Sequence, residues 1–157
     1  MRIKIRKANK KDILDIIEYT KKVADYHHNF DKYYAKGKGT EKFIRGYFFK
    51  NLKKRNYIIL VAEINGRIVG FFEAEIKKID NPFIVADKIG ELHDAFVDKK
   101  YRKSGIGKKI YNELVKWFKK NKIKHILLSV HVKNMLGKKV WGKLGFKDYM
   151  KRMRLDL

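Results

Sequence analysis

Apolar and polar residues alternate with two periods along the chain, and these periods divide its first part into one strand and two helices. Residues 2–6 alternate isoleucine with basic side chains, which is the period of a half-buried strand. Apolar residues then recur at helical spacing over 13–24 and again over 43–52, with Asp12 and Thr40 as the candidate residues at the helix starts. The pattern therefore predicts two helices between the first strand and the rest of the chain.

The middle of the chain has the pattern of an antiparallel hairpin. Segments 57–64 and 67–76 are rich in β-branched, aromatic and other apolar residues. The dipeptide Asn65-Gly66 joins them, and this dipeptide suits a tight turn in which both residues have positive φ. We expect a long two-stranded hairpin here.

The last part of the chain alternates strands and helices. Segment 89–97 is predicted to be a strand, 105–121 a helix with one apolar face, and 125–132 a second strand that runs parallel to the first. A short helix over 135–144 and a final strand within 146–157 complete the order βαα-ββ-βα-βαβ. This order predicts a single α+β domain, residues 1–157, with a central mixed sheet flanked by helices.

Composition limits the cellular compartment and the ligands expected for this domain. The 157 residues include no cysteine, which excludes disulfides, thiolate metal ligands and a cysteine nucleophile and favours a reducing compartment, so we expect a cytoplasmic protein. Neither a signal peptide nor a run of about 18 apolar residues is visible, and no membrane segment is expected. The net charge of +23 is spread along every segment. It favours acidic ligands. Because the lysines are not concentrated in one tail or helix, general surface charge is favoured over a dedicated nucleic-acid face.

One glycine-containing turn stands between the strand at 89–97 and the following helix. Its core is Arg102-x-x-Gly105-x-Gly107, surrounded by lysines. Two glycines at the start of a helix leave free N–H groups that bind anions, although the same pattern also suits an ordinary helix cap. The spacing matches neither a P-loop nor a dinucleotide fingerprint, because Arg102 and Ile110 occupy the positions where those motifs need glycine.

Several motifs together resemble the GNAT N-acetyltransferase superfamily. The turn matches its R/Q-x-x-G-x-G/A signature, and it follows the segment E-L-H-D-A-F-V-D. Downstream, N-x-x-G-x-x-x-W-x-x-x-G-F over 134–146 is similar to a second family pattern, and H-x-x-D-x-x-Y over 28–34 is similar to a third. The resemblance spans most of the chain. It implies the GNAT acyl-CoA N-acyltransferase fold, acetyl-CoA as co-substrate and an amine as acceptor.

The resemblance also implies which residues meet coenzyme A. The strand before the turn would offer backbone groups to the pantetheine arm, the turn would hold the pyrophosphate, and residues of the later motif would line the arm. This set comprises Phe96, Val97, Arg102, Lys103, Ser104, Gly105, Ile106, Gly107, Lys108, Asn134 and Trp141. For Val97 a core position is an alternative role, and for Asn134 a helix cap.

Acetyl transfer to an amine needs a group that takes a proton from the ammonium and a group that polarises the carbonyl. Glu91 and His93 share a face of their predicted strand because strand side chains alternate, whereas Asp94 points the other way unless a bulge intervenes. Glu91 and His93 correspond to residues that branches of the family use. We therefore predict Glu91 and His93 as catalytic residues, with Asp94 as a third candidate.

Trp141 departs from the family pattern, in which a tyrosine is usual. A tyrosine hydroxyl can protonate the departing thiolate, but an indole N–H does not give up its proton at working pH. Either another group, with Tyr149 and Tyr111 as candidates, supplies the proton, or the thiolate leaves unassisted, which its modest pKa allows. Trp141 can equally be a core residue of its helix.

Acceptor recognition is predicted between the first two helices. The resemblance assigns one wall of the acceptor cleft to this region, and His27, His28, Asp31 and Tyr34 offer acidic and aromatic contacts to a cation. We do not expect a metal site there, because adjacent residues rarely reach one ion.

The sequence thus predicts an acetyl-CoA-dependent N-acetyltransferase. The acetyl group would pass directly, in a ternary complex, to a primary amine of a small molecule or a protein, without a metal. The alternative is a non-catalytic module of the same fold that binds coenzyme A or nucleic acid through its basic surface. A homodimer is implied by family analogy only.

Overall fold

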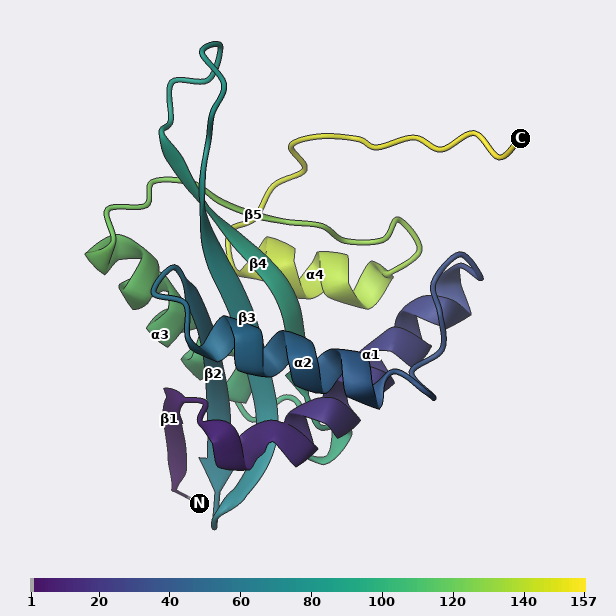
Figure 1. Ribbon diagram of the computed structural model, residues 1–157, viewed down its shortest axis with the longest axis vertical. Helices are drawn as coiled ribbons and strands as arrows, with labels where there is room; N and C mark the ends of the chain where they lie inside the picture. Colours follow the sequence, from purple (N-terminus) through teal and green to yellow (C-terminus); the bar gives the residue numbers. More distant parts are fainter. Residues whose placement is uncertain (1) are drawn as a thin grey trace.

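The computed structural model describes residues 2–157 as eleven elements around one sheet (Figure 1). They are β1 (Ile3–Lys7), the short 3-10 helix η1 (Lys10–Asp12), α1 (Ile13–Phe30), α2 (Glu41–Leu52), β2 (Tyr57–Ile64), β3 (Arg67–Lys78), β4 (Lys88–Val97), the 3-10 helix η2 (Lys99–Tyr101), α3 (Ile106–Lys120), β5 (Ile126–Leu128) and α4 (Met135–Lys143).

The five strands lie side by side in sequence order, β1 to β5. The first four pair antiparallel, with the tight turn at Asn65 and Gly66 as predicted, and β4 pairs parallel with β5 across Gly90–Leu92. The predicted mixed sheet and the parallel pair are therefore confirmed. β3 and β4 extend past the rest of the sheet as an arm, which is visible at the top of Figure 1.

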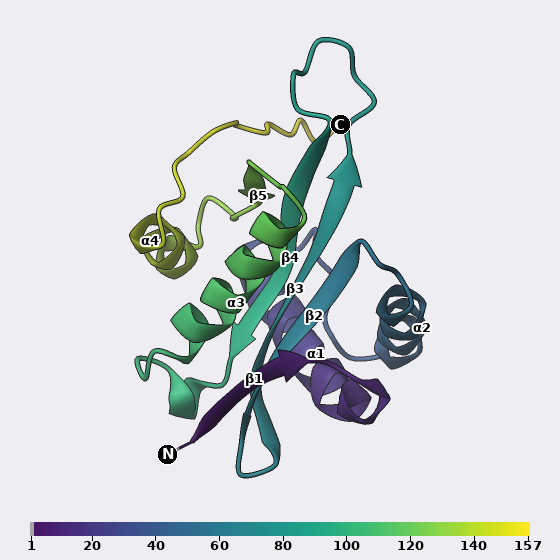
Figure 2. The same cartoon turned by 90° about the vertical axis from the view of Figure 1, so that its left-hand side faces the viewer.

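Helices cover both faces of the sheet (Figure 2). α3 buries Ile106, Ile110, Leu114 and Phe118 against one face, together with alternate residues of β2 and β3 such as Leu60. α1 and α2 cover the opposite face, where Ile16 and Phe48 meet the other set of β2 and β3 residues. Each strand residue thus belongs to one of two layers, and its position in the alternation decides which helices it meets.

Two predictions for the last strands are corrected. The strand predicted over 125–132 is paired only over Ile126–Leu128, and the final strand predicted within 146–157 does not form. After α4 the chain is extended, and residues 147–157 are all exposed (yellow in Figure 1). The alternation in this segment is that of a strand, but within one chain it has no strand neighbour among the described residues.

A buried ion pair fixes the start of α1 to the sheet. Asp12 is 4% exposed, and Arg6 of β1 donates to both of its carboxylate oxygens at 2.7 and 2.8 Å. Arg6 also contacts Glu63 of β2 at 2.7 Å. The Arg6 guanidinium lowers the pKa of Asp12 below its usual value, so the carboxylate is held in its charged form.

Candidate active site

A β-bulge in β4 is the feature that builds the candidate active site. Phe72 of β3 is opposite Ala95 of β4, and Ala74 is opposite Leu92, so that one residue of β3 faces two residues of β4. The single residue is Glu73, and the two are His93 and Asp94. The extra residue brings Asp94 to the same face as His93, which the alternation alone would not do.

Glu73, His93 and Asp94 line a pocket of about 360 Å³ between the sheet and the two N-terminal helices. α1 and α2 supply the other walls, which are mostly apolar and aromatic: Ile16, Thr20, Phe43, Ile44, Tyr47 and Phe48. The bottom of the pocket is therefore acidic, and its sides suit the carbon skeleton of a ligand.

The pKa values of both carboxyl groups are raised in the folded protein. Burial is the main cause for Glu73, which is 7% exposed, and the charge of Asp94 adds to it, so that its pKa rises to about 8. Burial also raises the pKa of Asp94, although positive charge on His27 and His93 partly offsets this. Two buried acids on neighbouring strands favour a state that keeps a proton between them at neutral pH.

His93 lies on the pocket wall with an unsatisfied nitrogen. Its ring stacks on Tyr57 at 5.9 Å between centroids. Nε2 is 3.4 Å from a carboxylate oxygen of Glu75, but it is not aligned for a hydrogen bond and has no partner among the described residues. The hydroxyls of Tyr57 and Tyr47 are 3.0 Å apart. His93 is thus placed to accept or donate a proton once a ligand enters.

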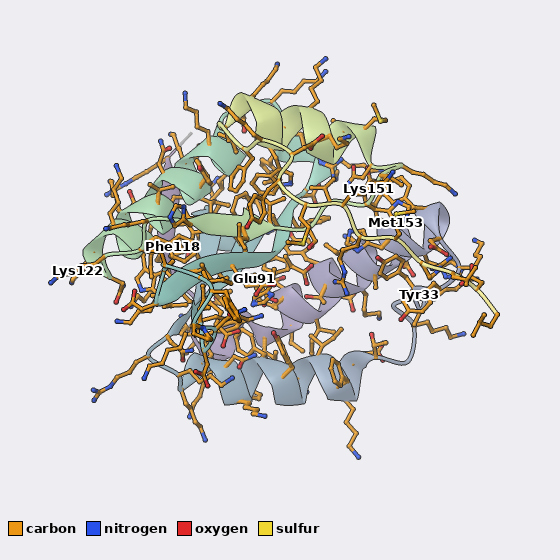
Figure 3. All side chains as sticks on the ribbon, turned by 90° about the horizontal axis from the view of Figure 1, so that it is seen from above. Tyr33, Glu91, Phe118, Lys122, Lys151 and Met153 are labelled. Atoms are coloured by element: carbon orange, nitrogen blue, oxygen red, sulfur yellow. The ribbon has the colours of Figure 1, made fainter. Side chains whose placement is uncertain are left out.

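Glu91 has different neighbours from the other two predicted catalytic residues. It shares the face of His93, as expected, but its carboxylate is ion-paired with Lys77 of β3 and it does not line the pocket. It is labelled on the sheet in Figure 3. The catalytic role of Glu91 stays a prediction. Glu73, which the sequence did not single out, lines the pocket instead.

The predicted acceptor-binding residues lie at the C-terminal end of α1 and in the following loop. Asp31 is ion-paired with Arg154 at 2.9 Å, and its side chain accepts a hydrogen bond from the Tyr33 backbone N–H at 3.0 Å. His28 Nδ1 lies 2.6 Å from the carbonyl oxygen of Tyr34, and the rings of His27 and Tyr34 are 5.6 Å apart. None of these residues lines the pocket, and Arg154 neutralises the charge of Asp31.

A further histidine belongs to this aromatic cluster. His131 stacks on Phe30 at 5.6 Å and lies 3.9 Å from Asp31. Lys133 of the same loop donates to the Phe30 carbonyl at 3.0 Å. The cluster therefore connects the end of α1 to the segment that enters α4. His131 lies near the end of the strand predicted over 125–132, and no motif in the sequence singled it out.

The turn before α3 has the backbone geometry of an anion cradle. Lys103 and Gly105 have positive φ angles of 64° and 81°. A Cβ added at Gly105 would meet open space, and one at Gly107 would meet only ordinary contacts with Val97 and Phe72. The N–H groups that open the first turn of α3 have no intrahelical acceptor, and Lys103 and Lys108 add positive charge.

The sheet is open beside this cradle. β5 pairs with β4 only as far as Leu92, so the β4 backbone from His93 to Val97 has no strand on that side among residues 2–157. Arg102 donates to the Val97 carbonyl at 2.9 Å and stands over the Phe96 ring. One stretch of β4 thus borders both the acidic pocket, through His93, and the turn, through Val97.

Asn134, at the start of α4, and Trp141, within it, both have structural partners. Asn134 caps the helix by accepting from the Gly137 N–H at 2.8 Å, and it also accepts from the Tyr26 hydroxyl at 3.1 Å. Trp141 packs edge-on against Phe72 at 5.9 Å and against Phe146 at 5.7 Å. Asn134 is therefore a helix cap and Trp141 packs against core side chains, which are the alternative roles raised from the sequence. Neither role excludes contact with a cofactor.

The matching family model decides the relationship of the chain to known proteins. The acetyltransferase (GNAT) family model matches residues 23–146. The chain belongs to the GNAT family. It is 33% identical over 144 residues to an uncharacterized N-acetyltransferase of Methanocaldococcus jannaschii, and the match covers 92% of this chain and 60% of that protein. The chain therefore spans about three fifths of the length of this relative.

Solved structures share the fold at lower identity. Aminoglycoside N-acetyltransferase AAC(6′)-Iy, in complex with the bisubstrate analogue CoA-S-monomethyl-acetylneamine, is 16% identical with a TM-score of 0.82, over 100% of this chain and 99% of that one. A predicted acetyltransferase from Clostridium acetobutylicum, solved with acetyl-CoA, is 21% identical with a TM-score of 0.77, over 99% and 96% of the two chains. These likenesses confirm the GNAT fold.

Two further properties concern residues 2–157 as described. No helix in this range is long and apolar enough to cross a membrane. No group of three or more histidine, aspartate or glutamate side chains in this range is arranged to hold a metal ion.

Proposed function

We propose that this chain transfers the acetyl group of acetyl-CoA to the primary amine of a small molecule, by direct attack in a ternary complex. The observation that carries the proposal is the shared stretch of β4 described above. It puts an acidic pocket on the α1 and α2 side of the sheet and an anion cradle on the α3 side, so that a donor and an acceptor can meet at one strand.

The cradle suits the coenzyme. Lys103, Gly105, Gly107 and Lys108 would hold the pyrophosphate. The backbone of Phe96 and Val97, beside which residues 2–157 place no strand on the β5 side, would receive the pantetheine arm. Arg102, Ser104 and Ile106 belong to the same turn and support its shape; Ser104 donates to the Tyr101 carbonyl at 2.5 Å. Bound acetyl-CoA supplies a thioester carbonyl as the acetyl donor.

The acidic pocket suits a cationic amine. Glu73 and Asp94 offer the negative charge that an ammonium group needs when it leaves water, and an incoming cation replaces the proton that the pair keeps. The aromatic and aliphatic walls from α1 and α2 would cover the carbon skeleton. A protein amino group is the second acceptor class, but a pocket of about 360 Å³ favours a small molecule.

Chemistry follows once the amine has lost a proton. Asp94 accepts that proton, with His93 beside it to position the amine or relay the proton. The amine nitrogen forms a bond to the carbonyl carbon and releases its second proton to solvent. The carbon–sulfur bond breaks, and the sulfur leaves as a thiolate that solvent can protonate. Glu91 stays the alternative base if its pairing with Lys77 opens.

Coenzyme A release with a panel of small amines, amino acids and peptides tests the proposal, with mass spectrometry for the added acetyl group. On an acceptor found in this way, we expect Asp94→Asn and His93→Ala each to lower kcat/KM by about a hundredfold or more. Glu91→Gln is the matched control from the same strand, and it should change kcat/KM by less than about threefold.

Two outcomes would overturn the assignment. A larger loss in Glu91→Gln than in Asp94→Asn would return the role of base to Glu91. If acetyl-CoA failed to raise the melting temperature, while DNA or RNA bound in a salt-sensitive way, the non-catalytic alternative would be favoured.

A further inference from the structure

The acidic pocket has its charged groups at one end and mostly carbon on its walls. Of the described residues on the α1 and α2 walls, only Thr20 and Tyr47 carry a polar side-chain group, and the Tyr47 hydroxyl is hydrogen-bonded to that of Tyr57 at 3.0 Å. Ile16 and Phe48 are 2% and 1% exposed. A ligand that extends past the acids therefore meets a surface that cannot replace its hydrogen bonds to water.

The pocket holds its negative charge at one place, the two acids at its bottom. The neighbouring acids of β3 and β4 have other partners: Glu75 accepts from the Asn56 amide at 3.3 Å, and Glu91 is ion-paired with Lys77. Neither Glu75 nor Glu91 lines the pocket. Among residues 2–157, the pocket lining therefore offers a counter-charge to one ammonium group and none to a second one farther along the ligand.

Two stacked aromatic rings continue the carbon wall to the solvent. Phe43 is 74% exposed, and its ring lies 6.1 Å from that of Tyr47 at an angle of 18°. Both residues line the pocket from α2, on the sheet face opposite α3 (Figure 2). An aromatic ring covers the carbon skeleton of a ligand at small entropic cost. Its attraction for a cation at an exposed site is weak compared with the hydration that an ammonium group loses.

We propose that the acceptor is a monoamine with an aliphatic or aromatic body, and that the α1 and α2 walls select it over amines with several cationic or hydroxyl groups. The ammonium group would meet Glu73 and Asp94, and the body would lie along Ile16, Phe48 and Phe43. This inference rests on the acetyl-transfer function proposed above. It names the class of amine, which that function leaves open.

The arrangement disfavours polyamines and aminoglycosides. Each of these carries further ammonium groups, and the second one would lie against the buried side chains of Ile16 and Phe48 without a counter-charge. A methyl group in place of that ammonium group avoids the loss of hydration and adds an apolar contact. One such apolar group in a hydrophobic pocket changes kcat/KM by about tenfold or more.

Two amines of equal length test the inference. Heptylamine and 1,6-diaminohexane differ only at the far end, where the first has a methyl group and the second has another amine. We expect the native chain to acetylate heptylamine with a kcat/KM about tenfold or more above that for 1,6-diaminohexane, and heptylamine to raise the melting temperature more. High salt in both measurements screens the net charge of +23, which would otherwise repel the dication by itself.

Phe43→Glu should reduce this preference. A carboxylate at this position would pair with the second ammonium group of 1,6-diaminohexane, and heptylamine would lose an apolar contact. We expect the ratio of the two kcat/KM values to fall by about tenfold, mainly through the KM values. Phe43 is exposed, so the variant should fold, and circular dichroism checks this.

Arg45→Glu is the matched control on the same helix. Arg45 is exposed, does not line the pocket, and points about 200° away from Phe43 around the helix axis. The substitution changes the net charge by more than Phe43→Glu does, so a general electrostatic effect would be larger in the control. We expect Arg45→Glu to leave the ratio of the two kcat/KM values within about twofold.

Three results would overturn the inference. The first is equal or faster acetylation of 1,6-diaminohexane, or of an aminoglycoside, by the native chain. The second is a ratio that Phe43→Glu leaves unchanged, or that both variants change equally. The third is a melting temperature that heptylamine raises no more than 1,6-diaminohexane does. Failure of the proposed function looks different: no amine would be acetylated, and a larger thermal shift with heptylamine would still support the preference of the pocket for a monoamine.

Discussion

Glu73 of β3 and Asp94 of β4 line one pocket because β4 carries an extra residue opposite Glu73. Without this bulge, Asp94 would point to the α3 face of the sheet and would be buried among aliphatic side chains. With it, two acids, one histidine and an aromatic wall meet at one place. Both acids are buried, and this burial has a measurable effect on stability.

The buried acids should make the protein less stable as the pH rises. The pKa of Glu73 is raised in the folded state to about 8, so its stabilising contribution is complete below the unfolded pKa of about 4 and is lost as the pH rises through the folded value. The free energy of unfolding of the native chain should fall by up to about 1.4 kcal/mol per pH unit in this window, relative to Glu73→Gln.

Urea unfolding at several pH values measures this difference. We expect Glu73→Gln to be more stable than the native chain at pH 8 and to lose acceptor binding, since the neutral amide fits the buried site but cannot neutralise an ammonium group. Glu75→Gln, on the same face of β3, is the control. Parallel pH curves for the native chain and Glu73→Gln would contradict a raised pKa for Glu73.

The sheet and most of its helices could be predicted from local pattern alone. Alternation marks a strand and helical spacing marks a helix whatever the strands pair with, and the Asn65-Gly66 turn fixes the register of its hairpin. The GNAT motifs also identified the family and predicted the anion cradle before α3. These features depend on residues that are close together in the sequence, so a single sequence is enough to predict them.

The remaining features of the site depend on which strands pair with each other. The alternation of apolar and polar residues does not contain that information. The bulge at His93 and Asp94 is defined by Glu73, some 20 residues earlier, so the position of Asp94 could be stated only conditionally. Glu73 itself had the same signal as Glu91, a carboxylate in an apolar strand, but no motif singled it out. Asp31 was expected to attract a cation, and its partner Arg154 is 123 residues away.

Gly105 tests the cradle apart from the pocket. Its φ of 81° is unfavourable for a residue with a side chain, so Gly105→Ala should lower the free energy of unfolding by about 1 kcal/mol. The added methyl group points into open space, where we propose that the pyrophosphate binds. The KM for acetyl-CoA should therefore rise by about tenfold, with a smaller change in the KM for the acceptor.

Gly46→Ala is the matched control for this substitution. Gly46 is an exposed residue within α2 with open space around it, so alanine should stabilise the helix by about 1 kcal/mol and leave the KM for acetyl-CoA unchanged. Thermal unfolding and initial-rate kinetics on both variants make the comparison. An unchanged KM for acetyl-CoA in Gly105→Ala would argue against a cofactor role for this turn.

The Arg6–Asp12 pair should matter for stability and not for catalysis. Asp12→Asn removes the negative charge beside a guanidinium and should cost about 3 kcal/mol. The pKa of Asp12 is lowered in the folded state, so its contribution is present above the unfolded pKa of about 4 and is lost as the pH falls through the folded value.

Unfolding curves from acid to neutral pH check this sign. The difference between Asp12→Asn and the native chain should be largest near neutral pH and should shrink in acid. Lys11→Ala, at the exposed neighbouring position, is the control and should change stability by less than about 0.5 kcal/mol. A difference that did not depend on pH would mean that packing, and not charge, is responsible.

Trp141 decides whether the reaction needs a general acid from α4. The ring packs on Phe72 and Phe146, so Trp141→Ala should lower stability by about 2 kcal/mol, whereas Trp141→Phe keeps an aromatic ring in contact with both. If the thiolate leaves without protonation by this residue, Trp141→Phe and Trp141→Tyr should both keep kcat within about threefold of the native chain. The pH profile of kcat should not change in either variant, because an indole does not titrate.

A hundredfold loss in a folded Trp141→Phe variant would instead assign the indole N–H a direct role in the transfer. A gain in Trp141→Tyr with a new alkaline limb near pH 10, the ordinary pKa of a tyrosine, would mean that thiolate departure limits the native reaction.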